Sequence, residues 1–331
     1  MIEMLNESKE DQQQLTQFSQ PSSESCPHRV EYITDPKTGM LHRITVLNQY
    51  HETDGGQRGE AERLHFYFGN GTTTKNASGR FMLGALAQLP KKVVITEAFR
   101  ESGDPQKAID GRRRVTKLAG FSEDDAIDLG GISKGANLAA LEAQQDGDRV
   151  GRLFTIEGVC SNNKTRLHLA HGAMGVLPEV LGDSFRRNTL DASRLIDIPD
   201  DYNEEFDTAK GWALNFAKGA LIGRLPIIAD NPRKLHKKTG WFAFVGSNDD
   251  LGDPTETLSL TDERDTFSTT VIPKGGHYAT KHINSITQEM REVFRSCAYR
   301  PPRELSIAAT RESLARSAAS AHFWTRSVAT A

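Results

Sequence analysis

The sequence predicts an α/β protein built on a mainly parallel, doubly wound, eight-stranded sheet with an N-terminal antiparallel hairpin and an inserted helical cap. Strand-like and helix-like patterns alternate between residues 91 and 158, which is typical of a parallel sheet with helices on both faces. Two strand-like runs near the start flank a turn sequence. The strand signal then disappears between residues 160 and 235 and returns afterwards, which indicates an insertion.

The elements follow one another in a regular order. The first two strands flank Asp35-Pro-Lys-Thr-Gly39, whose proline and glycine suit the turn of a hairpin. The third strand begins at Arg63 and runs into the glycine-rich sequence FGNGTTT. Further strands are expected over 91–98, 126–131, 152–158, 240–246 and 267–273, and helices over 105–119 and 134–145.

The chain divides into four predicted parts. Residues 1–27 are rich in Gln, Ser and Glu and poor in aromatic residues, so this tail cannot bury enough apolar surface to fold. The α/β core is expected over 28–159 and 236–299. Helical patterns without strand signals predict a cap at 160–235, and helix formers after a proline pair predict a helical C-terminal extension at 300–331.

Composition argues against several classes of function. The formal net charge of −3 comes from 41 basic and 44 acidic residues mixed along the chain, which provides no long-range field for nucleic acid or an anionic membrane. No apolar run approaches the roughly 20 residues of a membrane span, and the polar N-terminus is unlike a signal peptide. The three cysteines are too scattered for a disulfide framework or a zinc site. We therefore expect a soluble cytoplasmic protein.

The most informative stretch is DLGGISKGANLAA, in which Ser133 lies between Gly131 and Gly135 in the pattern G-x-S-x-G. A nucleophilic serine at a sharp turn from strand to helix has strained backbone angles, and its neighbours must be small so that strand and helix can approach. The pattern alone arises often by chance. Because it falls between a predicted strand and a predicted helix, Ser133 becomes a candidate nucleophile.

Such a serine needs a base, and the base needs an acid that orients it. His277 follows the last predicted strand in a glycine-containing loop, and Asp249 follows the preceding strand. Loops at the carboxyl ends of strands are where open α/β sheets assemble their sites. The order Ser133, Asp249, His277 is the one expected for a serine in this kind of turn. Asp250 stays open as a neighbouring choice for the acid, and Asp253 is a weaker one.

The tetrahedral intermediate of acyl transfer also needs hydrogen-bond donors for its negative oxygen. The backbone amide of Lys134, the residue after the serine, is one expected donor, because a helix N-terminus favours negative charge. The glycine-rich loop after the third strand can provide the second donor, for which we expect the backbone amide of Asn70.

Taken together, these segments resemble the α/β-hydrolase fold superfamily over roughly residues 40–297. The sequence FGNG at 68–71 is similar to the family's oxyanion loop, with Phe68 in place of a histidine, and GGISKGA is similar to its nucleophile turn. GSND at 246–249 resembles the acid loop, and GGH at 275–277 resembles the histidine loop. The resemblance implies a serine hydrolase with a helical cap inserted after the sixth strand.

Other interpretations of the same motifs are weaker. The loop FGNGTTTK lacks the G-K-[ST] ending of a nucleotide-binding loop. His168 and His171 are three residues apart but have no clear third metal ligand. Lys134 is adjacent to Ser133, and adjacent residues of the turn point in different directions, so a Ser-Lys pair is disfavoured. We therefore expect neither a cofactor nor a metal.

The sequence thus predicts a serine hydrolase that cleaves a carboxylic ester, or else an amide or thioester, through an acyl-enzyme. An acyltransferase on the same scaffold and a non-catalytic protein that binds a small ligand are the alternatives, because a fold does not determine its chemistry. The expected partner is a small acyl substrate. Acyl-chain preference and oligomeric state stay open.

Overall fold

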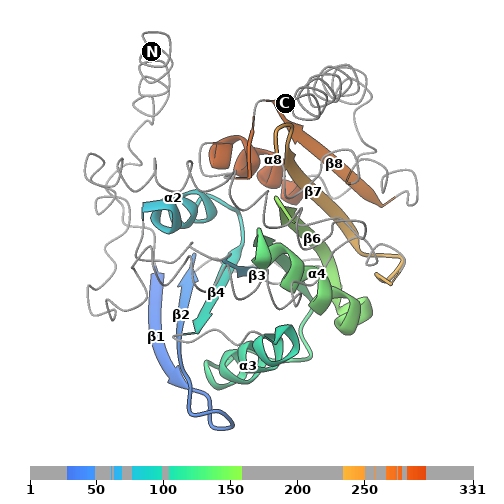
Figure 1. Cartoon of the computed structure of the whole chain (residues 1–331). Coiled ribbons are helices and arrows are strands. Elements are labelled where there is room, and N and C mark those ends of the chain that lie inside the picture. The colour runs from blue at the N-terminus through green and yellow to red at the C-terminus, as the bar shows by residue number, and fades with distance from the viewer. Residues whose placement is uncertain are drawn as a thin grey trace, which may run out of the picture.

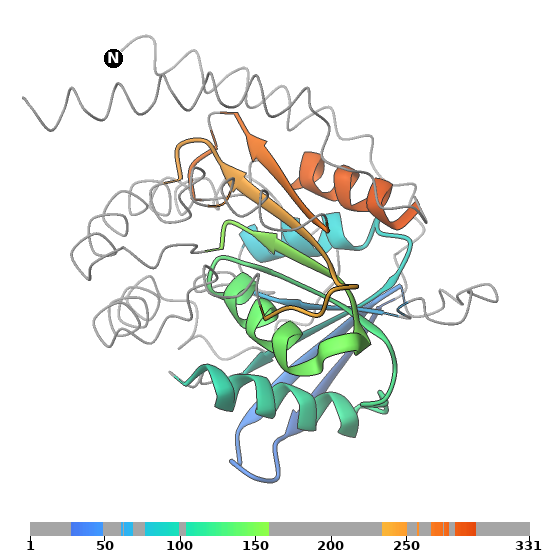
Figure 2. The same cartoon turned by 90° about the vertical axis from the view of Figure 1, so that its right-hand side faces the viewer.

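The computed structural model describes residues 28–48, 61, 63–68, 77–98, 104–158, 234–249, 257, 266–273, 275–277 and 282–295. These residues form one sheet with helices on both faces (Figures 1 and 2). The predicted tail (1–27), nearly all of the predicted cap (160–235) and the C-terminal extension (300–331) lie outside the described residues and stay predictions.

The sheet has eight strands, as the sequence predicts. They are β1 (His28–Thr34), β2 (Leu41–Leu47), β3 (Arg63–Tyr67), β4 (Lys92–Ala98), β5 (Ile127–Ile132), β6 (Val150–Ile156), β7 (Gly240–Gly246) and β8 (Phe267–Ile272). Their order across the sheet is β1-β2-β4-β3-β5-β6-β7-β8. β2 pairs antiparallel with both β1 and β4, and every other pair is parallel. The predicted fold class, with its N-terminal antiparallel hairpin, is confirmed.

The described helices are α2 (Ala77–Leu86), α3 (Pro105–Leu118), α4 (Lys134–Asp146) and α8 (Ile283–Arg295), with a short 3-10 helix η1 (Gly147–Arg149). Figure 2 shows α3 and α4 on one face of the sheet and α2 and α8 on the other. None of the described helices is long and apolar enough to cross a lipid bilayer.

The sequence predicts α3 and α4, whereas α2 and α8 were not predicted. In α8, the buried Ile283, Ile286 and Met290 recur at helical spacing. This apolar stripe could have been used to predict the helix from the sequence. The segment ASGRFMLGAL of α2 contains two glycines and a serine, which are weak helix formers. Packing of Met82 and Leu83 into the core supplies the stability that local propensity does not.

Strand β3 shows how the sheet is buried on both faces. Leu64 and Phe66 belong to the apolar cluster that includes α2 and α8, whereas Tyr67 belongs to the cluster of α3 and α4. Successive side chains of a strand point to opposite faces, and burying one large apolar side chain contributes about 1.5–3 kcal/mol. This two-sided packing holds the central strands in the sheet.

The hairpin between β1 and β2 is held by its turn and by α3. The carboxylate of Asp35 accepts hydrogen bonds from the backbone N–H of Lys37 (3.0 Å) and the hydroxyl of Thr38 (2.8 Å). Gly39 has a φ of 67°, which favours glycine. From α3, Arg114 donates two hydrogen bonds to the same carboxylate, at 2.9 and 2.7 Å. This pairing holds the pKa of Asp35 well below its usual range.

Candidate active site

Three candidate side chains meet at one edge of the sheet. Ser133 comes directly after β5, Asp249 is in the loop after β7, and His277 is in the loop after β8. From β5 to β8 the strands are parallel neighbours, so their carboxyl ends lie at the same edge. Loops from three strands can therefore converge there, as expected for an open α/β sheet.

The three side chains form a continuous chain of hydrogen bonds. The Oγ atom of Ser133 lies 2.9 Å from Nε2 of His277. The Nδ1 atom of His277 lies 2.9 Å from Oδ1 and 3.1 Å from Oδ2 of Asp249. Asp249 is 3% exposed and His277 is 8% exposed, whereas Ser133 is only partly buried. The buried carboxylate of Asp249 thus orients the imidazole of His277. The more accessible hydroxyl of Ser133 lies at the outer end of this series of hydrogen bonds.

The backbone of Ser133 has the strain that a sharp strand-to-helix turn requires. Its φ is 53° and its ψ is −123°, in a region that costs a non-glycine residue about 1–3 kcal/mol. Its N–H donates to the carbonyl of Ile156 in β6 (2.8 Å), and its side chain makes no capping bond to α4. The backbone is therefore anchored to the sheet, and the hydroxyl is left to contact His277.

The glycines of the motif are required by close backbone approach. A Cβ atom on Gly131 would lie 2.3 Å from the carbonyl oxygen of Gly135. A Cβ atom on Gly135 would lie 2.3 Å from the carbonyl oxygen of Tyr67 and 2.7 Å from that of Phe68. Contacts this short are not tolerated by real side chains, so β3, β5 and the first turn of α4 can meet only where both positions are glycine.

The acid loop and the histidine loop are joined in a similar way. A Cβ atom on Gly246 would lie 2.3 Å from the carbonyl oxygen of Gly275. The N–H of Asn248 donates to that same oxygen at 2.8 Å, and the N–H of Asp249 donates to the carbonyl of Gly246 at 3.1 Å. The two loops thus hold each other, and this places Asp249 against the imidazole of His277.

Of the other predicted site residues, the structure describes some and leaves others outside the described residues. Lys134 is the first residue of α4, so its backbone N–H belongs to the positive end of the helix beside Ser133. Asn70, Asp250 and Asp253 lie outside the described residues, as do His168 and His171. In the described part of the chain, no group of three or more His, Cys, Asp or Glu side chains is arranged to hold a metal ion.

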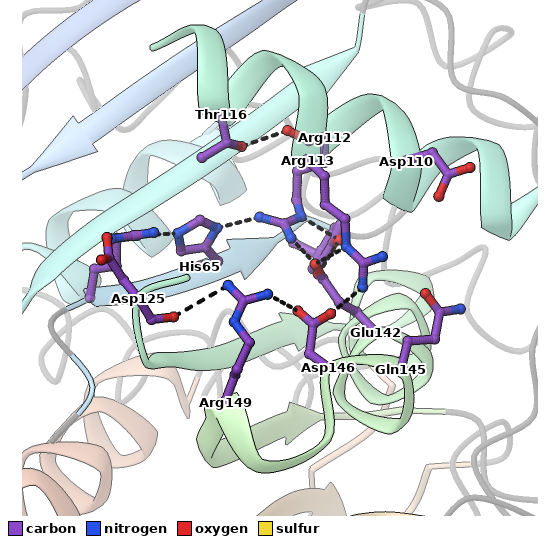
Figure 3. Close-up of polar contacts among 12 residues, drawn as sticks. His65, Asp110, Arg112, Arg113, Thr116, Asp125, Glu142, Gln145, Asp146 and Arg149 are labelled. Atoms are coloured by element: carbon purple, nitrogen blue, oxygen red, sulfur yellow. Dashed lines mark hydrogen bonds and ion pairs between the residues drawn. The ribbon is translucent and has the colours of Figure 1, made fainter. Parts of the chain in front are cut away.

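A cluster of buried charged and polar residues lies between the sheet and helices α3 and α4 (Figure 3), and it was not predicted from the sequence. It includes His65 and Tyr67 from β3, Arg112 from α3 and Glu142 from α4. No local pattern identifies such residues, because a buried charge in a helix has the same sequence signature as an exposed one. Only the pairing of distant elements brings these side chains together.

Two cavities of about 450 and 220 Å³ lie at the opposite edge of the sheet, near the amino ends of β3 and β5. The smaller cavity is lined by several arginines, but these have carboxylate partners within the cluster of Figure 3. Arg63 pairs with Asp125 and Arg113 pairs with Asp146, each at 2.5 Å. The charges there are neutralised internally, and both cavities are separated from Ser133 by the length of the strands.

Comparison with known proteins supports the architecture. No protein-family model matches the sequence, and no curated protein sequence matches it. Solved structures do match. An esterase from Thermogutta terrifontis shares 16% identity over 81% of this chain and 98% of its own, with a TM-score of 0.52. A meta-cleavage product hydrolase from Pseudomonas fluorescens shares 15% identity over 81% of this chain and 98% of its own, with a TM-score of 0.53.

A third match comes from work on the carboxylesterases of Nitrososphaera gargenis. It shares 12% identity over 80% of this chain and 98% of the other, with a TM-score of 0.51. At such low identity the likeness establishes the fold and leaves the activity to be argued from the site. The chain therefore has the α/β-hydrolase fold, which confirms the resemblance that its motifs indicate.

Proposed function

We propose that this protein is a serine hydrolase that cleaves a carboxylic ester through Ser133, His277 and Asp249. The observation that carries the proposal is the continuous chain of hydrogen bonds from the hydroxyl of Ser133 through both nitrogens of His277 to the carboxylate of Asp249. A nucleophile, a base and an orienting acid in this geometry are the requirements for acyl transfer by serine.

The reaction begins when Nε2 of His277 takes the proton from Ser133 and Oγ attacks the carbonyl carbon of the ester. Asp249 holds the imidazole in the tautomer that leaves Nε2 free to accept, and it stabilises the imidazolium that forms. The backbone amides of Lys134 and Asn70 are the proposed donors to the negative oxygen of the tetrahedral intermediate.

Collapse of that intermediate breaks the ester bond. His277 returns its proton to the departing alkoxide, and the acyl group stays bonded to Ser133. A water molecule then gives a proton to His277 and attacks the acyl-enzyme, which releases the carboxylic acid and restores the hydroxyl of Ser133. Strain in the backbone of Ser133 supports this role, because such conformations cluster at active sites.

A fluorophosphonate probe tests the proposal directly, since it reacts covalently with an activated serine. The wild-type protein should be labelled and should hydrolyse p-nitrophenyl butyrate, whereas Ser133→Ala should do neither while keeping its fold. Folded wild-type protein that shows neither labelling nor hydrolysis of a series of p-nitrophenyl esters would instead indicate a ligand-binding protein. Transfer of the acyl group to an added alcohol in preference to water would indicate an acyltransferase.

A further inference from the structure

The larger of the two cavities, about 450 Å³ in volume, has a floor made by four neighbouring strands. Arg29 of β1 is the register partner of Val46 of β2, and Lys92 of β4 is that of Arg63 of β3. Val46 belongs to the apolar cluster that packs against α3, so the floor is on the face that α3 covers. A volume of this size is within the range of about 300–1,000 Å³ that is typical of small-molecule sites.

The chain that follows α3 forms a wall of this cavity. Gly120 has a φ of 89°, and the N–H of the next residue, Phe121, donates back to the carbonyl of Thr116 at 3.2 Å. This turn places the ring of Phe121 between two guanidinium groups, 5.8 Å from that of Arg29 and 5.1 Å from that of Arg63. Cations near the ring are attracted by its π electrons, so the ring is held as an apolar wall.

The three cations that line the cavity differ in their partners. Arg63 is 4% exposed and pairs with Asp125, which also lines the cavity, at 2.5 Å. Arg29 pairs with Glu31 at 3.1 Å, and both side chains are 35% exposed. Lys92 is half-buried, and its ammonium group makes no hydrogen bond or ion pair within the described part of the chain. One positive charge of the lining therefore has no counterion among these residues.

The surroundings of Lys92 favour an anion. Its register partner Arg63 carries the same charge, and like charges on neighbouring strands repel. The carbonyl oxygens at the end of α3 would disfavour an anion, but Nη2 of Arg29 donates to the carbonyl of Ala119 at 3.3 Å and so covers that negative end. Arg29 uses Nε for Glu31, which leaves Nη1 for a further acceptor. An anion with two oxygens can thus contact Lys92 and Arg29 together.

We propose that this cavity binds a small organic carboxylate, whose charged group contacts Lys92 and Arg29 and whose apolar body packs against Phe121 and Val46. A carboxylate carries the single negative charge that compensates Lys92, whereas a phosphate monoester carries about −1.5 to −2 at pH 7. The site lies at the edge of the sheet opposite Ser133. It is therefore a second site, which neither requires nor supports the proposed ester hydrolysis.

Calorimetric titration of the full chain with sodium benzoate tests the proposal. Wild-type protein should bind benzoate saturably, and Lys92→Met should bind it about tenfold more weakly, because a charge-assisted contact is lost. Lys92→Arg keeps the positive charge and should bind within about threefold of wild type. The thermal midpoint of each variant, measured without benzoate, checks that the protein is folded.

Two controls separate this site from other ways of binding benzoate. Lys107 is an exposed lysine near the start of α3, and Lys107→Met makes the same chemical change away from the cavity. This variant should bind benzoate as wild type does. Benzamide has nearly the same shape as benzoate but no charge, so it should bind at least about tenfold more weakly to wild type.

The proposal is overturned if wild type shows no saturable binding, if Lys92→Met binds benzoate as tightly as wild type, or if benzamide binds as tightly as benzoate. Tighter binding of phenyl phosphate than of benzoate would overturn the choice of a carboxylate. Ser133→Ala should keep the benzoate affinity of wild type, and loss of binding in this variant would place benzoate at the serine instead. The esterase proposal is tested separately, by fluorophosphonate labelling, which Lys92→Met should leave unchanged.

Discussion

The hydroxyl oxygen of Ser133 lies 2.9 Å from Nε2 of His277, although 144 residues separate the two along the chain. Ser133 is held by the carbonyl of Ile156 at the end of β6, and the loop of His277 is held through Gly275 by the end of β7. Each partner is thus anchored to a strand of the same parallel sheet. The distance between them is set by the spacing of strands rather than by either loop alone.

Replacement of the proposed base should nearly abolish activity. His277→Ala removes the group that accepts the proton of Ser133, and we expect kcat for p-nitrophenyl butyrate to fall by about 10³-fold or more. The matched control is His236→Ala, in the segment before β7, which should keep wild-type kcat. Equal activity of His277→Ala and wild type at the same purity would contradict the proposed mechanism.

The two neighbouring aspartates can be distinguished by the same assay. Asp249→Asn leaves an amide beside Nδ1 of His277, which favours the wrong tautomer, and kcat should fall by about 10⁴-fold. Asp250→Asn should retain most of the activity. If Asp250→Asn lost more kcat than Asp249→Asn, Asp250 rather than Asp249 would be the acid.

Two glycine-to-alanine substitutions, both within helices, should have opposite effects on stability. In Gly135→Ala the new Cβ would lie 2.3 Å from the carbonyl oxygen of Tyr67, so we expect the free energy of unfolding to fall by about 1–3 kcal/mol and activity to be lost. In Gly111→Ala, within α3, the nearest atom would be in the ring of His42 at an ordinary 3.5 Å. There the free energy of unfolding should rise by about 0.5–1 kcal/mol.

Urea unfolding of both variants measures these changes. The packing argument at the serine turn would be refuted by a Gly135→Ala protein as stable and as active as wild type. Gly111→Ala serves as the control, because it makes the same chemical change in a helix without the close backbone contact.

The ion pair of Asp35 with Arg114 should make stability depend on pH. Because Arg114 lowers the pKa of Asp35 in the folded protein, the contribution of the pair is fully present above the ordinary aspartate pKa of about 4 and is lost as the pH falls below it. Asp35→Asn should therefore reduce the free energy of unfolding at pH 7 by about 1.5–3 kcal/mol.

The same comparison at lower pH provides the check. Urea unfolding of wild type and Asp35→Asn at a series of pH values should show the difference shrinking below about pH 4. A difference that stays constant down to pH 3 would mean that the carboxylate charge of Asp35 does not supply the stabilisation.

Most of the strands were predictable because their signals are local. The apolar runs of β4 and β7 and the turn at Asp35 depend only on residues close together in the chain. The segment of α2 was not predicted, because its glycines weaken the helix signal and its stability comes from packing against α8 and the sheet. The strand order was not predictable either, since β3 and β4 exchange places between β2 and β5.

The sequence motifs of the candidate site could be recognised before the structure was known. Ser133 with its flanking glycines, and the histidine and aspartate after later strands, could be chosen because each follows a strand that the local pattern reveals. The carboxylate of Asp249 lies 2.9 Å from Nδ1 of His277, whereas Asp250 lies outside the described residues. That contact is set by the backbone pairing of two distant loops, which no local pattern encodes.

By itself, the sequence determined the α/β class, the serine turn and the order of the three polar residues. Hydrophobic periodicity and glycine spacing can be recognised from residues that are close together in the chain. The tertiary structure alone decided that Tyr67, Arg112 and Glu142 form a buried cluster between the sheet and helices α3 and α4. Those three side chains come from a strand and two helices, and a charged residue is stable inside the protein only where folding brings its partner to it. Long-range packing therefore decided how the segments around Ser133 are held together.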